Sequence, residues 1–476
     1  MTLNRKIRRI GLISPCLGNL GNAAIMSAMI ANIRLRVPDA EIIGITLSPE
    51  DTRHRHGIDA FPITSASRSN YSSSNANGSA TQHQPTNGLS RIKEGLKHIP
   101  LLRSLVRTLR LYCMELAHIM AASRLVRKLD RVIITGGGAL DEFWGGPWGH
   151  PWTLFKFGVL SRVWRVPFLF VSVGKCSLEH PLSRFFVRRA LNLAEYRSYR
   201  DHDSKIAVQA IFHSPDDPVC PDLAYSYPCP GLGSELRPDL PLRHSHGWSN
   251  RGLSNPGVSN ERLVVGVSPI AYCDSRVWPL KDEQRYLRYL HQLAEMVKWL
   301  IQQKHQVVLF ATDSPDSETI SDLQILISDG SVDTSSVEVL PGPPEQTTES
   351  LLQQIRHADL VIASRLHGVI LSHLIAIPVL AISYDRKVDV HMSEIGQSEY
   401  CVNIDQVDAS TLIERFSALQ DVRERESAHL KRAVQLNREQ VDAQYDRLLG
   451  AIQLSGSVEE NRDQLNQDQV TAPLEP

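Results

Sequence analysis

The feature that most constrains the fold is a regular alternation of short apolar runs and longer segments with helical periodicity. Apolar runs predict strands at residues 9–14, 131–135, 262–268 and 306–311, and most of them are followed by segments with a period near 3.6. Parallel strands need crossover helices, so this alternation predicts parallel sheets covered on both faces. A chain of 476 residues is too long for one core. We therefore expect two doubly wound α/β domains in tandem.

Segments rich in small and polar residues divide the chain. Residues 62–90 have almost nothing to bury and are interpreted as a disordered insertion, and residues 229–260 as an interdomain linker. The polar tail from 455 to 476 is also expected to be disordered. These segments define an N-terminal domain at 1–228 and a C-terminal domain at 261–454.

Composition narrows the class of protein. The chain has 42% hydrophobic residues and a formal net charge of −1, which is ordinary for a globular protein and indicates no nucleic-acid partner. Its seven cysteines contain no C-x-x-C pair, and its histidines form no metal motif, so no metal site is expected. No apolar run approaches the ~20 residues of a membrane span. We expect a cytoplasmic protein.

Residues 91–128 interleave leucines with arginines. One interpretation is a helix that belongs to the domain core. The other is an amphipathic helix that rests on an anionic membrane, because apolar and cationic residues share neighbouring faces. The second interpretation would make the protein peripheral at the inner face of the cell membrane.

Arg365 and His367 interrupt two apolar stretches directly after a predicted strand. Ligands of open parallel sheets bind at the carboxyl ends of strands, where helix N-termini present free amides. We expect Ser364 to cap the next helix, Arg365 to bind a small anion and His367 to donate a proton. The alternative is that Arg365 pairs with a carboxylate and His367 only packs.

These residues belong to a segment that resembles a known family. DLVIASRLHGVILSHLIAIPVLAISYDRKV (359–388) resembles the R-L-H segment of the polysaccharide pyruvyl transferases. LGNLGNAAI (17–25), TGGGALDEF (135–143) and SYRDHDSK (198–205) resemble other family segments in the same order. The resemblance covers most of residues 9–400 and implies two Rossmann-like, doubly wound domains that face a cleft, as in the glycosyltransferase-B fold.

The resemblance also implies an activity. Family members transfer the pyruvate moiety of phosphoenolpyruvate to two hydroxyls of a glycan sugar, form a ketal and release phosphate. The implied partners are phosphoenolpyruvate, which is the donor substrate, and a glycan or lipid-linked oligosaccharide acceptor in cell-surface or exopolysaccharide biosynthesis; no cofactor is implied. Two alternatives remain open, a nucleotide-sugar glycosyltransferase of the same fold and an inactive homologue within a polysaccharide-assembly complex.

The resemblance implies donor-binding and proton-donating roles for the residues that match the family's motifs. Arg365, followed by Leu366, should bind the phosphate or carboxylate of the donor, and His367 should protonate its methylene carbon. Arg200 matches the other anion-binding arginine, whereas the neighbouring Asp201 is expected only to begin a helix. Tyr384 and Lys387 match a supporting Tyr-x-x-Lys pair.

Loop residues complete the expected site. Asp141 could orient or deprotonate an acceptor hydroxyl, or could simply cap a helix or turn. Gly136, Gly137 and Gly138 form a turn that would let backbone approach the ligand. The usual Asn-x-Gly-Asp loop reads Asn19-Leu-Gly-Asn22 here, and we expect Asn22 to replace the aspartate as a helix cap. Were a carboxylate needed there, the acceptor would differ or the protein would be inactive.

Three tryptophans stand close together at 144, 148 and 152. Trp144, Trp148 and Trp152 could stack on acceptor sugars. They could equally build the core or the rim of the cleft.

Overall fold

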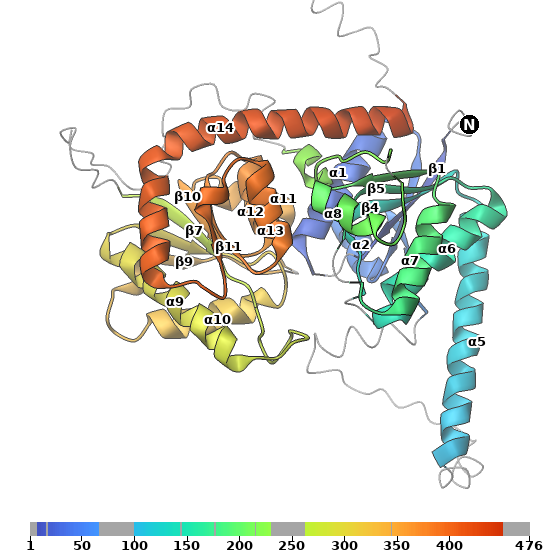
Figure 1. The fold of residues 1–476 in the computed structure, drawn as a ribbon, viewed down its shortest axis with the longest axis horizontal. Helices are drawn as coiled ribbons and strands as arrows, with labels where there is room; N and C mark the ends of the chain where they lie inside the picture. Colours follow the sequence, from blue (N-terminus) through green and yellow to red (C-terminus); the bar gives the residue numbers. More distant parts are fainter. Residues whose placement is uncertain are drawn as a thin grey trace, which may run out of the picture.

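The computed structural model consists of two parallel six-stranded sheets, each flanked by helices (Figure 1). It describes residues 7–15, 18–65, 100–142, 145–175, 178–214, 216–229, 262–343 and 345–450, with backbone only at 100–107 and 175. The expected linker and tail therefore lie almost wholly outside the described residues, as does the insertion beyond Ser65. The expected fold class is confirmed.

The first sheet has the strand order β3-β2-β1-β4-β5-β6. Its strands are β1 (Arg9–Ser14), β2 (Glu41–Thr46), β3 (Asp59–Pro62), β4 (Arg131–Leu140), β5 (Phe168–Lys175) and β6 (Tyr196–Tyr199). The direction of winding reverses between β1 and β4, which pair directly. We call this sheet and its helices, residues 7–229, the N-terminal unit.

The second sheet has the order β12-β11-β10-β7-β8-β9. Its strands are β7 (Val264–Ser268), β8 (Gln306–Leu309), β9 (Val337–Val339), β10 (Leu360–Ala363), β11 (Val379–Ser383) and β12 (Cys401–Asn403). Winding reverses between β7 and β10. We call residues 262–408 the C-terminal unit. Each sheet thus has a switch point at the carboxyl ends of two central strands, where ligands of such folds bind.

The prediction that the three consecutive glycines form a turn is wrong. Gly136, Gly137 and Gly138 lie inside β4, which was predicted to end at Thr135. Gly136 and Gly137 have φ of 49° and 64°, and the register with β5 shifts between Gly137 and Leu140. The glycines therefore form a bulge, because their positive φ angles are ones that other residues rarely adopt.

Helices cover both sheets and connect successive strands. They are α1 (Leu20–Arg36), α2 (Pro49–His56), α5 (Pro100–Val126), α6 (His150–Trp164), α7 (Pro181–Leu193), α8 (His202–Gln209), α9 (Glu283–Gln302), α10 (Asp316–Ile327), α11 (Thr348–Ile355), α12 (Leu366–Leu374), α13 (Arg386–Glu394) and α14 (Ala409–Leu449), with 3-10 turns η2 (Gly146–Trp148), η3 (Leu223–Ser226), η4 (Thr334–Ser336) and η5 (Ser398–Tyr400). In the described part of the chain, no helix is both long and apolar enough to cross a bilayer.

Helix α14 follows the C-terminal unit in sequence but also packs on the N-terminal unit, so it spans both (Figure 1). Gln444 lies near its end and is buried, and its amide bonds the hydroxyls of Ser172 and Ser198 at 2.9 and 2.6 Å. Arg36 of α1 donates to Asp446 at 2.7 Å. These buried polar contacts fix the long helix against the first sheet.

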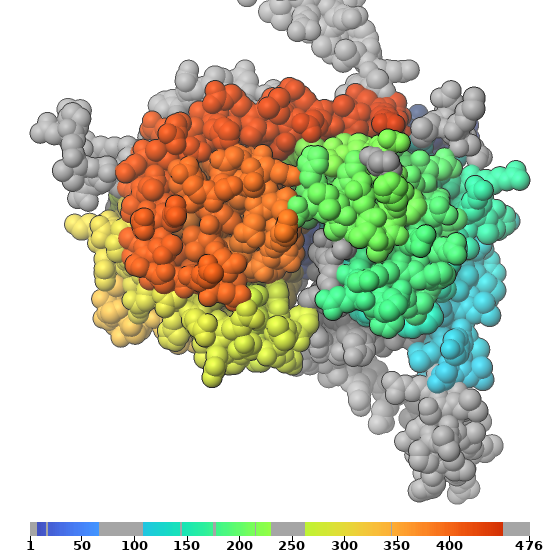
Figure 2. Space-filling view, in the orientation of Figure 1, coloured from blue at the N-terminus to red at the C-terminus, as the bar shows by residue number. Residues whose placement is uncertain are grey.

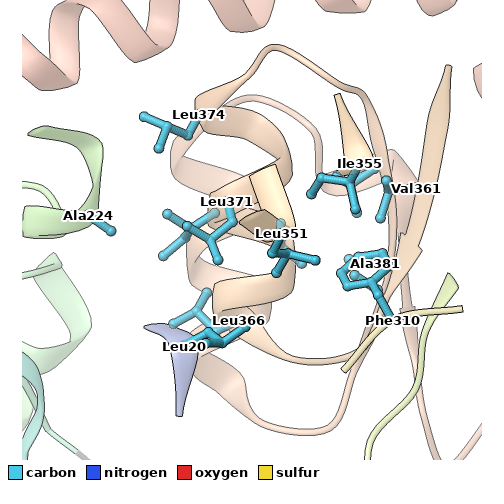
Figure 3. Close-up of a cluster of buried hydrophobic side chains, with 14 of the residues drawn as sticks. Leu20, Ala224, Phe310, Leu351, Ile355, Val361, Leu366, Leu371, Leu374 and Ala381 are labelled. Atoms are coloured by element: carbon cyan, nitrogen blue, oxygen red, sulfur yellow. The ribbon is translucent and has the colours of Figure 1, made fainter. Parts of the chain in front are cut away.

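The two units touch directly at the start of α1. The Leu20 amide donates to the Thr312 carbonyl at 2.8 Å, and the Ser314 amide donates to Gly18 at 3.0 Å. Leu20 lies beside Leu366 at the first turn of α12 (Figure 3). In the space-filling view, the orange surface of the C-terminal unit meets the green surface of the N-terminal unit along one boundary (Figure 2), and α12 contacts η3. The carboxyl edges of the two sheets are thereby brought together.

Candidate functional site

His367 lies where the two switch points meet. It sits in the first turn of α12, after β10, and faces the first turn of α1, after β1. A Cβ on Gly21 would lie 2.0 Å from the Cγ atom of His367, so only glycine allows the imidazole this close. The side chain is 15% exposed, and its Nε2 atom has no hydrogen-bond partner among the described residues. One ring nitrogen is therefore left for a ligand or a proton.

Asp222 joins His367 to Arg200 across the interface. Its Oδ2 atom lies 3.8 Å from Nε2 of His367 and 3.4 Å from a guanidinium nitrogen of Arg200. Its Oδ1 atom accepts from the Ala224 amide at 2.9 Å, which fixes the carboxylate at the start of η3. Asp222 is 3% exposed, so the contact is shielded from bulk water.

Arg200 follows β6 and extends along the ends of β4 and β5. A Cβ on Gly174 would lie 2.7 Å from a terminal nitrogen of Arg200, so this glycine provides room for the guanidinium. Arg200 also pairs with Asp201 at 3.3 Å. Asp201 caps α8, where it accepts from the Ser204 amide at 2.6 Å, as expected from the sequence.

Arg365 is held by two carboxylates of the C-terminal unit. Its guanidinium donates to both oxygens of Asp316 at 2.7 and 2.8 Å and pairs with Asp313 at 3.1 Å. Both aspartates follow β8, at the same sheet edge. Two of the five guanidinium N–H groups donate to Asp316, which leaves others for an anion. The arrangement matches the carboxylate pairing considered as an alternative, and the anion-binding role stays a prediction.

This network also reaches α1. Asn19 forms an isolated β-bridge with Asp313, and a side-chain hydrogen bond from Asn19 favours the Asp313 carboxylate. Burial, together with the charge of Asp316, nevertheless raises the pKa of Asp313 to about 6, although Arg365 opposes the rise. Burial lowers the pKa of Arg365, but Asp316 and Asp313 more than offset this and raise it. The arginine therefore stays charged.

A cavity of about 270 Å³ lies between the two units; Asp222, which faces His367, lines it, but His367 itself does not. Helix α13 contributes Lys387, His391 and Glu394 to its wall, at the i, i+4 and i+7 positions of one helix face. The other lining residues are Arg200, Asp201, His202, Val219, Pro221, Asp222, Tyr225, Leu366, Ile370, Ile395, Asn437 and Gln440. Two cations, Arg200 and Lys387, thus face one small space.

His391 is a cavity residue that the sequence interpretation missed. Its Nε2 atom lies 3.2 Å from Nδ1 of His373 and 3.5 Å from the Tyr225 hydroxyl. Burial lowers the pKa of His391 to about 4. The sequence did offer a signal for His391: it lies four positions after Lys387, and residues three or four positions apart share one face of a helix.

The site holds His367 neutral. Burial lowers its pKa to about 4, and the carboxylate of Asp222 opposes that shift. The cations that lower it further are, in order, Arg200, Lys387 and Arg365. Three cations and one imidazole therefore share the interface, which is an environment that attracts a compact polyanion.

Burial makes the fold sensitive to acid. The pKa values of His56, His150, His367 and His391 are all lowered to about 4, chiefly by burial. Between pH 6.5 and about 4 the unfolded chain binds more protons at these sites, so we expect the free energy of unfolding to fall by several kcal/mol as pH drops through this window. Asp313, with its raised pKa, offsets part of this loss.

Urea unfolding at neutral pH and near pH 5 measures the effect. The variant His150→Gln should flatten the pH dependence, and His291→Gln, at an exposed position on α9, should leave it unchanged. An unfolding free energy that is equal or higher near pH 5 would contradict neutral burial of these histidines.

Two caps differ from expectation. Asn19, not Asn22, caps α1 and accepts from the Asn22 amide at 3.0 Å, so the capping interpretation of Asn22 is wrong. The Asn22 side chain instead lies over the β4 bulge, where a Cβ on Gly137 would be 3.2 Å from its Oδ1 atom. Ser364 does not cap α12; Arg365 holds the cap position, and the Ser364 hydroxyl lies 2.9 Å from that of Tyr289.

Several predicted residues lie away from the cavity. Asp141 follows β4 and is not among the residues that line the space, so its role stays a prediction. Trp148 and Trp152 pack edge-on against Phe186, at 5.5 and 5.3 Å between ring centroids, which fits the packing interpretation. Trp144 lies outside the described residues.

The remaining predicted contacts surround Lys387. Its ammonium lies 5.0 Å from the ring centroid of Tyr384, which is within cation–π range. Tyr384 packs edge-on against Trp278 at 5.8 Å. Gly138 is half-buried within β4. No three His, Cys, Asp or Glu side chains converge as a metal site in the part of the chain that the structure covers.

Solved structures share the arrangement of the two sheets. A UDP-GlcNAc 2-epimerase from Methanocaldococcus jannaschii superposes with a TM-score of 0.50 at 9% identity, covering 86% of this chain and 92% of that one. A glycosyltransferase from Rickettsia africae gives 0.50 at 11% identity, covering 94% and 99%. Identities this low show the fold alone. No curated protein sequence matches significantly.

A family model provides the sequence relationship that the low identities of these structures leave open. The model for polysaccharide pyruvyl transferase matches residues 19–386, which include Asn19, the β4 glycines, Arg200 and the Arg365–His367 segment. Since the match extends from the first turn of α1 to the start of α13, both sides of the interface described above fall within it, and the chain belongs to the polysaccharide pyruvyl transferase family.

Proposed function

We propose that this protein transfers the pyruvyl group of phosphoenolpyruvate to two hydroxyls of a glycan sugar. The observation that carries the proposal is the position of Asp222, 3.4 Å from Arg200 and 3.8 Å from His367. It links an anion-binding arginine of one unit to a proton donor of the other. The family membership supports the same reaction class.

The donor carries a carboxylate and a phosphate, so it needs at least two cationic anchors. Arg200 and Lys387 line the cavity, and Arg365 lies close enough to act on the charge of His367. Arginine forks suit planar or tetrahedral oxyanions, whereas lysine acts as a point charge. The space of about 270 Å³ is smaller than the ~300–1,000 Å³ sites that hold drug-sized ligands, which favours a three-carbon donor over a nucleotide sugar.

The proposed chemistry begins with proton transfer. His367 gives a proton to the methylene carbon C3; the C2=C3 electron pair forms the new C–H bond and leaves an oxocarbenium centre at C2. One acceptor hydroxyl adds to C2. Phosphate then leaves with the electrons of its C2–O bond, and the second hydroxyl closes the ketal. Of the two hydroxyl protons, one restores His367 and the other leaves with phosphate.

This sequence requires His367 to become protonated when the donor binds. In the free protein its pKa is lowered to about 4 by burial and then by the nearby cations. A bound polyanion screens those cations and adds negative charge beside the ring, which raises the pKa. Asp222 then faces an imidazolium and stabilises it. Binding of the donor would thereby protonate His367, the acid that the reaction needs.

The test incubates the purified full chain with phosphoenolpyruvate and candidate glycans. Release of phosphate together with a ketal-bearing glycan in the mass spectrum would support the proposal. Consumption of a nucleotide sugar with release of nucleoside diphosphate would replace it with a glycosyltransferase. Glycan binding without turnover of either donor would assign the chain to the inactive homologues. We place the reaction in the cytoplasm, where phosphoenolpyruvate is available.

A further inference from the structure

One face of the N-terminal unit exposes an unusual share of apolar side chains. Of the sixteen large hydrophobic residues that are exposed in the described chain, nine lie on α5, η2, α6 and α7. They are Leu109, Leu111, Tyr112, Leu116, Met120, Trp148, Val163, Trp164 and Phe185. A clustered exposed apolar patch of this kind marks an interaction surface.

The three helices form one surface. Glu115 of α5 accepts from Nε1 of Trp152 of α6 at 2.8 Å, and Trp164 at the end of α6 donates to Ser123 of α5 at 2.9 Å. Phe155 of α6 stacks on Phe186 of α7 at 5.3 Å. Helix α5 then continues beyond this packed part and projects away from the body (Figure 1). We call the exposed side of α5, η2, α6 and α7 the α5–α7 face.

The projecting helix has an apolar stripe. Leu109, Tyr112, Leu116 and Met120 are spaced three or four residues apart and are between 47% and 71% exposed. This spacing places them on one side of the helix. They lie outside the domain core, so the interpretation of this segment as a buried helix does not apply to them.

The charged side chains of the α5–α7 face are almost all cationic. Helix α5 has four arginines, α6 one arginine and one lysine, and α7 three arginines, whereas Glu115 is the single acidic residue on all three helices. Glu115 is turned inward and pairs with Lys156 at 3.2 Å. The whole chain has a net charge of only −1, so this face is cationic through local enrichment.

The exposed arginines are free to act outward. Arg124, Arg162 and Arg188 make no ion pair with any described residue. Two others lie over aromatic rings, Arg127 on Trp164 at 5.5 Å and Arg189 on Phe185 at 5.4 Å. Tryptophan and tyrosine beside arginine are typical of the membrane–water interface, where rings enter the headgroup layer and cations contact phosphates.

We propose that the α5–α7 face docks the protein onto an anionic lipid bilayer. The exposed leucines and methionine enter the acyl boundary, and the unpaired arginines bind lipid phosphates. A membrane fits better than a nucleic acid because aliphatic side chains offer no stacking surface to bases but partition into lipid. This inference is independent of the donor chemistry, since none of these side chains lines the cavity.

Vesicle flotation of the purified full chain tests the proposal. We expect binding to phosphatidylcholine vesicles that contain about one-third phosphatidylglycerol and little binding to phosphatidylcholine alone. Raising the salt from about 0.1 M to about 1 M should weaken it, since the screening length falls from about 10 to 3 Å. The triple variant Arg124→Gln/Arg162→Gln/Arg188→Gln should bind on the order of 100-fold more weakly, about fivefold per arginine.

Matched variants separate this face from the rest of the surface. Leu109→Ser/Leu116→Ser should lose binding, whereas Ile325→Ser/Leu436→Ser, at exposed apolar positions of α10 and α14, should not. Arg415→Gln/Arg432→Gln on α14 is the charge control. Equal binding to neutral and anionic vesicles, or none, would overturn the proposal. It would also be overturned if Leu109→Ser/Leu116→Ser converted a dimer to a monomer without changing flotation, because the face would then bind a second copy.

Discussion

Replacing His367 with glutamine is expected to lower the rate of pyruvyl transfer by ~10²–10⁴-fold, the usual contribution of a positioned general acid. Glutamine keeps the polarity and approximate size of the side chain but cannot carry the proton. Arg200 and Lys387 still line the cavity. Donor affinity should therefore change only a fewfold, so the loss appears in kcat and not in KM.

Proton uptake gives an independent readout for the same residue. The pKa of His367 is about 4 in the free protein, and the mechanism needs the imidazolium in the complex. Calorimetry at neutral pH, in buffers of different ionisation enthalpy, should therefore show net proton uptake when phosphoenolpyruvate binds. The uptake should fall in His367→Gln and persist in His291→Gln.

His391 supplies the sharper comparison, because it lines the cavity, which His367 does not, and its pKa is also about 4. Its Nε2 atom already contacts His373 and Tyr225, whereas Nε2 of His367 has no hydrogen-bond partner among the described residues, so we expect His391→Gln to lose much less activity. If both variants lost equal activity, or if His367→Gln kept the proton uptake, the proton could not be assigned to His367.

Much of the architecture could be predicted from periodicity. Strands β1, β7 and β8 were expected within two residues of their observed ends, because each is a short apolar run of the kind that predicts a buried strand. The R-L-H segment was expected at a strand end, and His367 lies there. The contact of His367 with Asp222 of the other unit could not be predicted. The periodicity of each sheet's own residues does not show how the two sheets pack against one another.

Several residues of the site were missed for the same reason, namely that contacts between the two units cannot be predicted from local sequence patterns. Asp222 stands in the loop after α8, at the N-cap of η3, and its role is recognisable only because α12 brings His367 next to it. Asp313 and Asp316 follow β8, a signal that sheet-edge reasoning could have used. Gly21 and Gly174 are needed because His367 and Arg200 occupy the space that a Cβ would fill. The constraints on Asp222, Gly21 and Gly174 come from tertiary contacts and leave no local pattern.

Arg365→Met is expected to cost about 3–5 kcal/mol of folding free energy, the usual result of removing one partner from a buried ion pair. Asp316 is fully buried and Asp313 is 18% exposed, and both face this guanidinium. Methionine leaves two buried carboxylates without a counterion. The matched control is Arg285→Met, which removes a solvent-exposed pair with Asp405, 32% and 41% exposed, and should cost far less, because water screens such pairs.

The dependence on pH shows whether the arginine serves charge balance, ligand binding or both. Arg365 opposes the raised pKa of Asp313, so without the cation Asp313 would protonate more readily, and the penalty in Arg365→Met should shrink between neutral pH and pH 5, where Asp313, with a pKa of about 6, is already changing charge. Arg365→Lys keeps a charge but loses the fork. It should recover most of the stability, measured by urea unfolding, while donor affinity stays reduced. If Arg365→Lys restored donor affinity fully, the guanidinium would have no place in donor recognition and would serve only to hold Asp313 and Asp316 at the interface.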